Sequence, residues 1–185
     1  MINILENPQS ETYKLLKNNI LNHTFPWYYS DYDVKTPLER VQQYGVDRLK
    51  NHTQVPFYSH CILDRPESKK YSSAESHLLE ESIVAINEII KYNLGDKKYF
   101  HLRICANCTH PSTDIQFSMP HHDHEFDHLN FICYLNNAGG KTFIEGEDPY
   151  DPSEDQCILF SGEHYMELPK KERRVVLVST IFPCS

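Results

Sequence analysis

The stretch PHHDHEFDH, residues 120–128, gathers side chains that commonly bind metal ions: four histidines, two aspartates and one glutamate. Within it, His121 and Asp123 are two residues apart, and at the end of a strand such residues project to the same side. The apolar stretch LNFICYL follows directly and would hold this strand end rigid. His121 and Asp123 are therefore candidates to ligate one ion, with His122 pointing away.

A third ligand is available downstream, where His164 follows the apolar stretch CILF and a turn that contains a glycine. Two histidines and one carboxylate occupy one face of an ion and leave three positions open. This is the ligand set of non-haem Fe(II) oxygenases. The set His121, Asp123 and His164 thus predicts an iron site.

The same stretch permits other interpretations. A run this polar can be a solvated loop without a metal. His122 and His124 form the His-x-His pair that cupins use, although Glu125 follows too soon and no glycine comes shortly after. His128 could also reach an ion, but its spacing from Asp123 fits no triad. We expect His122, His124 and His128 to lie outside the ligand set.

Strands must position these ligands, and they are predicted where apolar residues alternate or form short unbroken runs. The predicted strands are Val55–Leu63, Tyr99–Asn107, Leu129–Leu135, Lys141–Ile144, Cys157–Phe160 and Val175–Phe182. The turn sequence NNAGG, residues 136–140, is expected to join two of them as a hairpin.

Two helices are predicted, both ahead of the strands that would carry the ligands. Ser10 caps the first, over Glu11–Asn22. The second begins at a capping box formed by Ser72 and Glu75 and ends at Gly95. Their apolar faces contain Tyr13, Leu16 and Ile20 in the first helix and Leu79, Ile83, Ile86 and Ile90 in the second. The apolar stripe of the second helix needs a sheet face to cover it.

This order of elements predicts a mainly β fold, a jelly-roll or barrel-like core with N-terminal helical support. We expect one domain over residues 1–185. Residues 1–98 would be the helical and loop support, and residues 99–185 would be the β-core that carries the metal site.

Two other motifs are interpreted as structural. The aromatic stretch FPWYYSDY, residues 25–32, is expected to pack as a core plug around Trp27, because aromatic clusters are core more often than site. The six cysteines are expected to be buried thiols and not disulfides. The spacing of Cys105 and Cys108 is typical of metal or redox pairs, but no second pair accompanies them.

The order of all these parts resembles the 2-oxoglutarate/Fe(II)-dependent oxygenase superfamily. The matching segments are RICANCTHPSTDIQFSMPHHDHEFDHLNFICYLNNAGGKTFIEG and DQCILFSGEHYMELPKKERRVVLVSTIF, within residues 99–182. The sequence looks most like the small prolyl-hydroxylase-like members of marine bacteria and phages. The resemblance implies a double-stranded β-helix, with Fe(II) held by His121, Asp123 and His164, and 2-oxoglutarate and O₂ as cosubstrates.

The resemblance also implies which residues bind 2-oxoglutarate. Its members carry an arginine about ten residues after the distal histidine, and that position falls on Arg174, with Arg173 as the alternative. A guanidinium grips a carboxylate with two hydrogen bonds. The hydroxyl often found two residues later is replaced here by Val176. The remaining cosubstrate-binding candidates are Asn107, Tyr134 and Thr180.

We therefore expect an enzyme that hydroxylates a C–H bond of a peptidyl proline or a small molecule. The alternative is a non-catalytic jelly-roll protein that binds a metal or ligand. The net charge of −8 and the lack of a basic stripe argue against nucleic acid as a partner. No apolar run is long enough to span a bilayer, and MINILENPQSETYK lacks a signal-peptide pattern, which predicts a cytoplasmic protein. The oligomeric state is left open.

Overall fold

The computed structural model describes residues 1–31, 51–66 and 76–184 of the chain. Its largest element is a seven-stranded sheet with the order β1-β9-β7-β11-β5-β4-β2, in which all neighbours are antiparallel. Two smaller sheets pair β10 with β8 and β3 with β6. The strands are β1 (Asn3–Leu5), β2 (Tyr28–Ser30), β3 (His52–Thr53), β4 (Phe57–Leu63), β5 (Tyr99–Thr109), β6 (Phe117–Ser118), β7 (Leu129–Tyr134), β8 (Thr142–Ile144), β9 (Cys157–Phe160), β10 (His164–Met166) and β11 (Arg174–Pro183).

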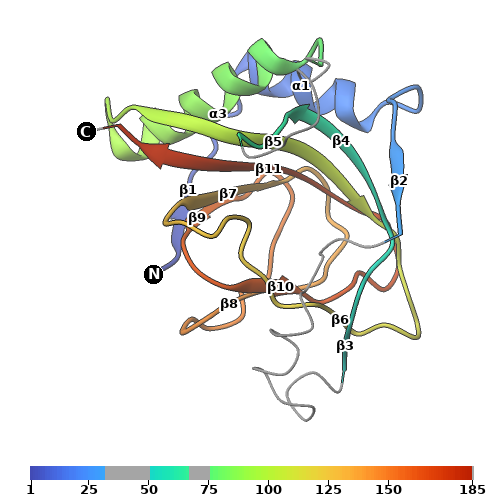
Figure 1. The fold of residues 1–185 in the computed structure, drawn as a ribbon. Helices are drawn as coiled ribbons and strands as arrows, with labels where there is room; N and C mark the ends of the chain where they lie inside the picture. The colour runs from blue at the N-terminus through green and yellow to red at the C-terminus, as the bar shows by residue number, and fades with distance from the viewer. Residues whose placement is uncertain (32–50, 67–75, 185) are drawn as a thin grey trace.

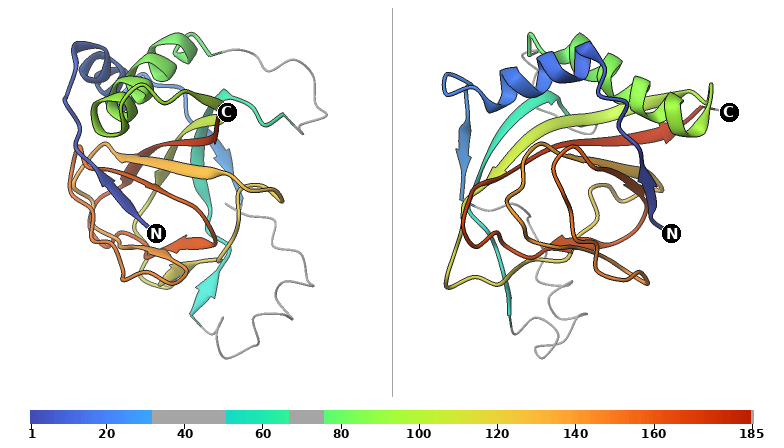
Figure 2. Two further views of the ribbon diagram at one scale, coloured as in Figure 1. Left: turned by 90° about the vertical axis from the view of Figure 1, so that its left-hand side faces the viewer. Right: turned by 180° about the vertical axis from the view of Figure 1, so that it is seen from behind.

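The helices α1 (Glu11–Leu21) and α3 (Leu79–Leu94) lie together against one face of the large sheet, and β8 and β10 lie on its other side (Figures 1 and 2). The space between the large sheet and β8–β10 is the inside of the β-core. The expected jelly-roll core with helices packed against it is confirmed.

Strand β11 shows how the sequence builds both faces of the large sheet. Its side chains at 175 and 177 pack with the helices, and those at 176 and 178 face the inside of the core. Every residue from Arg174 to Ile181 is buried as a result. A strand covered on both faces is a continuous apolar run, which explains the sequence RVVLVSTI.

The start of α1 and the end of α3 are capped as their sequences predict. Ser10 accepts a hydrogen bond from the backbone N–H of Tyr13 at 3.2 Å, and α3 ends at Gly95, where φ is +75°. The predicted capping box of Ser72 and Glu75 lies outside the described residues. Helix α3 begins at Leu79, and the Ser76 hydroxyl accepts from the N–H of Leu78 just before it.

Both predicted helix faces cover the sheet. Tyr13, Leu16 and Ile20 of α1 are buried, as are Ile86 and Ile90 of α3. The other members of the α3 stripe, Leu79 and Ile83, are partly buried against the same core.

The prediction of a hairpin at residues 136–140 is wrong. Strand β7 pairs with β9 and β11, whereas β8 pairs with β10 in the other sheet. The segment therefore crosses from one wall of the core to the other. Asn136 anchors it, because its side chain accepts from the N–H of Val175 and donates to the carbonyl of Arg173.

Two other expectations need adjustment. Trp27 packs against the core as predicted, but Tyr28 and Tyr29 are 65% and 60% exposed, so the aromatic plug is confined to Phe25 and Trp27 among the described residues. The six cysteines are free thiols, as expected, although Cys61 is exposed. Within the described ranges no helix has the length and apolar character needed to cross a bilayer.

Candidate functional site

His121 and His164 come together because their backbones pair directly. They form an isolated antiparallel bridge in which each N–H donates to the carbonyl of the other residue at 3.0 Å. The ring centroids are 4.4 Å apart. Residues 43 positions apart in the chain are thus fixed side by side at the end of β10, which the sequence did not predict as a strand.

Hydrogen bonds set the same tautomer for both rings. The Nδ1 of His121 lies 3.1 Å from the carbonyl oxygen of Met119, and the Nδ1 of His164 lies 3.3 Å from that of Gly162. A carbonyl only accepts hydrogen bonds, so each Nδ1 carries the proton. The lone pair of each neutral ring is therefore on Nε2, which is the atom free to ligate an ion.

Asp123 completes the group. The ligand atoms of His121, Asp123 and His164 all lie within 4.8 Å of one another, and Asp123 Oδ2 is 3.6 Å from His164 Nε2. The other carboxylate oxygen, Oδ1, is 3.1 Å from Arg103 and 3.3 Å from Arg65. The two arginines thus hold one oxygen and leave the second facing the histidines.

The charges of this group suit a metal site. Burial opposes ionisation of Asp123, but nearby His164, His121, Arg103 and Arg65 outweigh it and hold the pKa of this carboxyl well below its usual range. Burial, assisted by His121, lowers the pKa of His164 to about 3 despite the opposing effect of Asp123. At neutral pH the carboxylate is charged and the His164 ring is neutral, as ligands must be.

A cavity of about 400 Å³ opens beside the three residues, between the large sheet and β10. Ile132, Val176 and Val178 form an apolar wall, and Arg174 also lines the cavity. The strand register places Arg103 opposite Thr180 and Thr109 opposite Arg174. Arg174 therefore lies at the other end of the inner wall from Arg103 and the three clustered ligands.

Arg174 is buried and has no carboxylate partner among the described residues. Its guanidinium donates to the Thr142 hydroxyl at 2.9 Å, contacts the sulfur of Met166, and lies 5.2 Å from the ring centroid of Tyr134. Its Nε has no hydrogen-bond partner. Burial lowers the pKa of Arg174 from its ordinary value, with Tyr134 opposing the shift.

The other predicted cosubstrate residues are placed differently. Asn107 lines the cavity and accepts from the Ser59 hydroxyl at 2.9 Å. Tyr134 lies behind Arg174, where its hydroxyl hydrogen-bonds that of Thr142 at 2.7 Å. Thr180 does not line the cavity, and its hydroxyl is bonded to Nε2 of His124 at 2.8 Å. Arg173 is also absent from the cavity lining.

The remaining histidines of the cluster do not belong to the group that could hold a metal ion. His124 and His128 are buried together, with ring centroids 4.8 Å apart, and His124 stacks on Phe126. His122 is exposed at the rim of the cavity. Sequence reasoning missed the contacts of Arg65 and Arg103 with Asp123, since no local pattern links residues this far apart.

No known family profile and no curated protein matches this sequence. The structure is similar to an oxidoreductase of the 2OG-Fe(II) oxygenase family from Burkholderia pseudomallei, with a TM-score of 0.54 and 12% identity over 95% of this chain and 92% of that one. It is also similar to SnoN, a non-haem α-ketoglutarate-dependent epimerase from nogalamycin biosynthesis, with a TM-score of 0.58 and 10% identity over 98% and 78% of the two chains. The chain thus shares its fold with 2-oxoglutarate/Fe(II) oxygenases.

Proposed function

We propose that this protein is an Fe(II)- and 2-oxoglutarate-dependent oxygenase that hydroxylates a C–H bond. The observation that carries the proposal is the joint presence, in one cavity, of a His-Asp-His group and a buried guanidinium without an anionic partner among the described residues. A simple metal-binding protein needs the first of these features and not the second.

The donor set fits Fe(II). Two imidazoles offer Nε2 and one carboxylate offers Oδ2, which is the two-histidine, one-carboxylate combination used by non-haem iron. The backbone bridge between His121 and His164, together with the two arginines on Asp123, orients these atoms before an ion binds. Such outer contacts fix ligand orientation and tune metal affinity.

The far end of the cavity fits the distal carboxylate of 2-oxoglutarate. An unpaired buried charge is costly, and a bound carboxylate relieves that cost by accepting hydrogen bonds from the guanidinium of Arg174. The hydroxyl of Thr142 already touches this guanidinium and stands beside the same carboxylate position. Tyr134 packs behind Arg174 and limits its movement.

Each part of the cavity then has a task. His121, Asp123 and His164 hold the iron, and Arg174 binds and orients 2-oxoglutarate. The apolar wall of Ile132, Val176 and Val178 excludes water from between them. When bound, iron and 2-oxoglutarate supply the O₂-dependent oxidising chemistry, which no protein side chain can perform alone.

The substrate is proposed only by class. The candidates are a peptidyl proline, which the sequence resemblance to prolyl-hydroxylase-like members of marine bacteria and phages suggests, and a free small molecule. The fold does not choose between them, because one fold serves many reactions. The non-catalytic binding protein remains the second functional class, and the burial of Arg174 argues against it.

Formation of succinate tests the proposal. The purified protein is loaded anaerobically with Fe(II) and 2-oxoglutarate, exposed to O₂, and assayed for succinate with and without candidate prolyl peptides. We expect succinate that requires Fe(II) and that is lost in the variant His164→Ala. Tight binding of both ligands without any succinate, across a peptide and small-molecule panel, would favour the binding-protein alternative.

A further inference from the structure

Cys61 and Cys105 are directly opposite each other on neighbouring antiparallel strands, β4 and β5. Residues in such positions have Cα atoms about 4.5–5.5 Å apart. Disulfides need Cα separations of roughly 4.4–6.8 Å. The backbone therefore places these two cysteines within bridging distance without any rearrangement of the strands. Both are free thiols.

The two thiols differ in access to solvent. Cys61 is exposed, whereas Cys105 is 2% exposed. The interaction between the two thiols raises the pKa of Cys61 and lowers the pKa of Cys105, against the effect of burial and with the support of the Arg103 guanidinium. The pair thus combines an accessible sulfur with a buried partner directly opposite it on the neighbouring strand.

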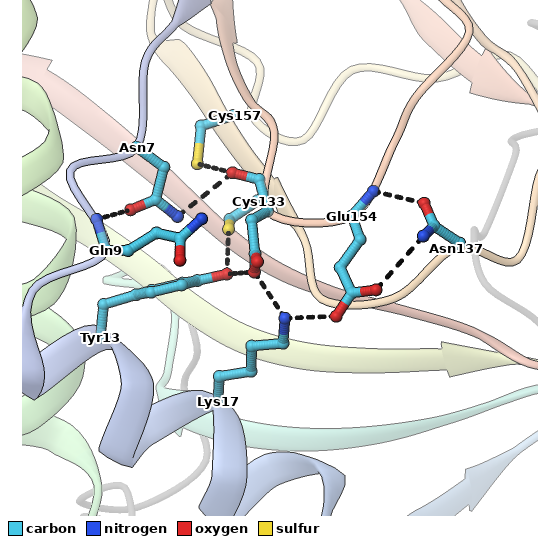
Figure 3. Close-up of polar contacts among 9 residues, drawn as sticks. Asn7, Gln9, Tyr13, Lys17, Cys133, Asn137, Glu154 and Cys157 are labelled. Atoms are coloured by element: carbon cyan, nitrogen blue, oxygen red, sulfur yellow. Dashed lines mark hydrogen bonds and ion pairs between the residues drawn. The ribbon is translucent and has the colours of Figure 1, made fainter.

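A second cross-strand pair in the same protein provides a built-in comparison. Cys133 of β7 is opposite Cys157 of β9 in the same kind of register. Both are fully buried beneath α1, and the Cys133 thiol donates to the Tyr13 hydroxyl (Figure 3). This pair has the geometry for a bridge but no contact with solvent.

We propose that Cys61 and Cys105 form a redox-active dithiol that closes reversibly to a disulfide. With a peroxide as oxidant, Cys61 is first oxidised to a sulfenic acid and one water is released. The Cys105 sulfur then attacks the Cys61 sulfur, the S–S bond forms and the sulfenic oxygen leaves as a second water. The two thiols lose two protons and two electrons, and the peroxide is reduced by the same two electrons.

Disulfide mapping tests the proposal directly. The full-length, metal-free protein is treated with a stoichiometric amount of hydrogen peroxide, alkylated without reduction, digested and analysed by mass spectrometry. We expect a peptide pair linked through Cys61 and Cys105 that dithiothreitol separates, while Cys133 and Cys157 stay alkylatable after denaturation. A bridge at Cys133–Cys157 in its place, or overoxidised Cys61 without a bridge, would overturn the proposal.

Two variants complete the test. Cys61→Ser should abolish the bridge, and Cys133→Ser should leave it unchanged. These measurements do not depend on turnover, so they stand apart from the proposed oxygenase activity.

Discussion

Arg174 places a positive charge inside the core with no carboxylate beside it among the described residues. An isolated buried charge of this kind is tolerated when a ligand supplies the missing anion. Its neighbour Arg173 does not line the cavity and lies on the side of β11 near Cys108. Two adjacent arginines therefore have different environments, and this difference is testable.

Replacing Arg174 with leucine should weaken 2-oxoglutarate binding and leave Mn²⁺ binding nearly unchanged. Loss of a buried charged contact costs about 2–5 kcal/mol, and the lower figure already corresponds to roughly thirty-fold in Kd. Calorimetric titration of 2-oxoglutarate into the Mn²⁺-loaded protein measures this. Arg173→Leu is the matched control and should bind normally. The reverse pattern would mean that Arg173 binds the cosubstrate.

His101 should make stability depend on pH. Its ring is bonded to Ser179 and Asn87, and burial lowers its pKa from 6.5 to about 4. As pH falls from 6.5 towards 4, the unfolded chain takes up this proton before the folded one does. The free energy of unfolding should therefore decrease through that window, by at most about 1.4 kcal/mol per pH unit for this residue.

Urea unfolding at pH 7 and pH 5 checks the effect. The variant His101→Gln should show a smaller loss between the two conditions than the unaltered protein. Some loss should persist, because the pKa of His164 is lowered in the same direction. An unchanged loss in the variant would show that His101 does not contribute.

At the scale of elements, α1 is joined to the β-core by a polar network as well as by its apolar face. The Tyr13 hydroxyl donates to Asp155, and Lys17 reaches both Asp155 and Glu154 at 2.6 Å (Figure 3). These acids lie just before β9, in the loop that leads into the strand beside β7. The network therefore fixes the helix to the large sheet beside β9, which pairs with β7, and Ile132 of β7 lines the cavity.

Tyr13→Phe should destabilise the fold by about 1.5–3 kcal/mol, the usual contribution of a hydrogen bond to a charged group. The free energy of unfolding in urea provides the measurement. Tyr92→Phe is the control, because Tyr92 is 59% exposed and its bond to Glu6 is long, at 3.5 Å. Similar losses in the two variants would contradict an anchoring role for Tyr13.

The crossing segment between β7 and β8 depends on Gly140. This residue has a φ of +83°, and a Cβ atom there would lie 2.4 Å from the carbonyl oxygen of Glu167. Gly139 has a similar φ of +71° but open space around it. The two glycines thus share a backbone requirement and differ in steric contact.

Gly139→Ala should cost about 1 kcal/mol of stability from the backbone conformation alone. Gly140→Ala should cost a further 1–3 kcal/mol, because the added methyl displaces the backbone at Glu167. Urea midpoints of the two variants measure the difference. Equal losses would show that the neighbouring chain can move aside, and that the close approach is not required for the crossing.

At the scale of the whole molecule, ligand binding should raise thermal stability. A ligand that binds only the folded state at one hundred times its Kd adds about 2.7 kcal/mol. Tm should therefore rise with Mn²⁺ and rise again when 2-oxoglutarate is added. In Arg174→Leu the first increase should remain and the second should shrink. A second increase of full size in that variant would place 2-oxoglutarate elsewhere.

The sequence determined the composition of the site and most of the elements that carry it. The His-x-Asp pair and the distal histidine are local patterns, and the periods of apolar residues predicted both described helices and the long strands. Arg174 was preferred to Arg173 because the superfamily that the sequence resembles has an arginine about ten residues after the distal histidine, and this choice stays a prediction. The local patterns succeed because each depends on neighbours within a few positions of the chain.

Only the tertiary structure decided how distant segments meet. Three contacts join residues that lie tens of positions apart in the chain. They are the backbone bridge between His121 and His164, the contacts of two arginines with Asp123, and the pairing of Cys61 opposite Cys105. The turn at residues 136–140 looked like a hairpin because its local sequence is that of a tight turn, yet strand β11 from the end of the chain pairs with β7 instead. For Thr180, strand alternation gives the side on which the residue points, but the neighbouring His124 decides what its hydroxyl contacts in this structure.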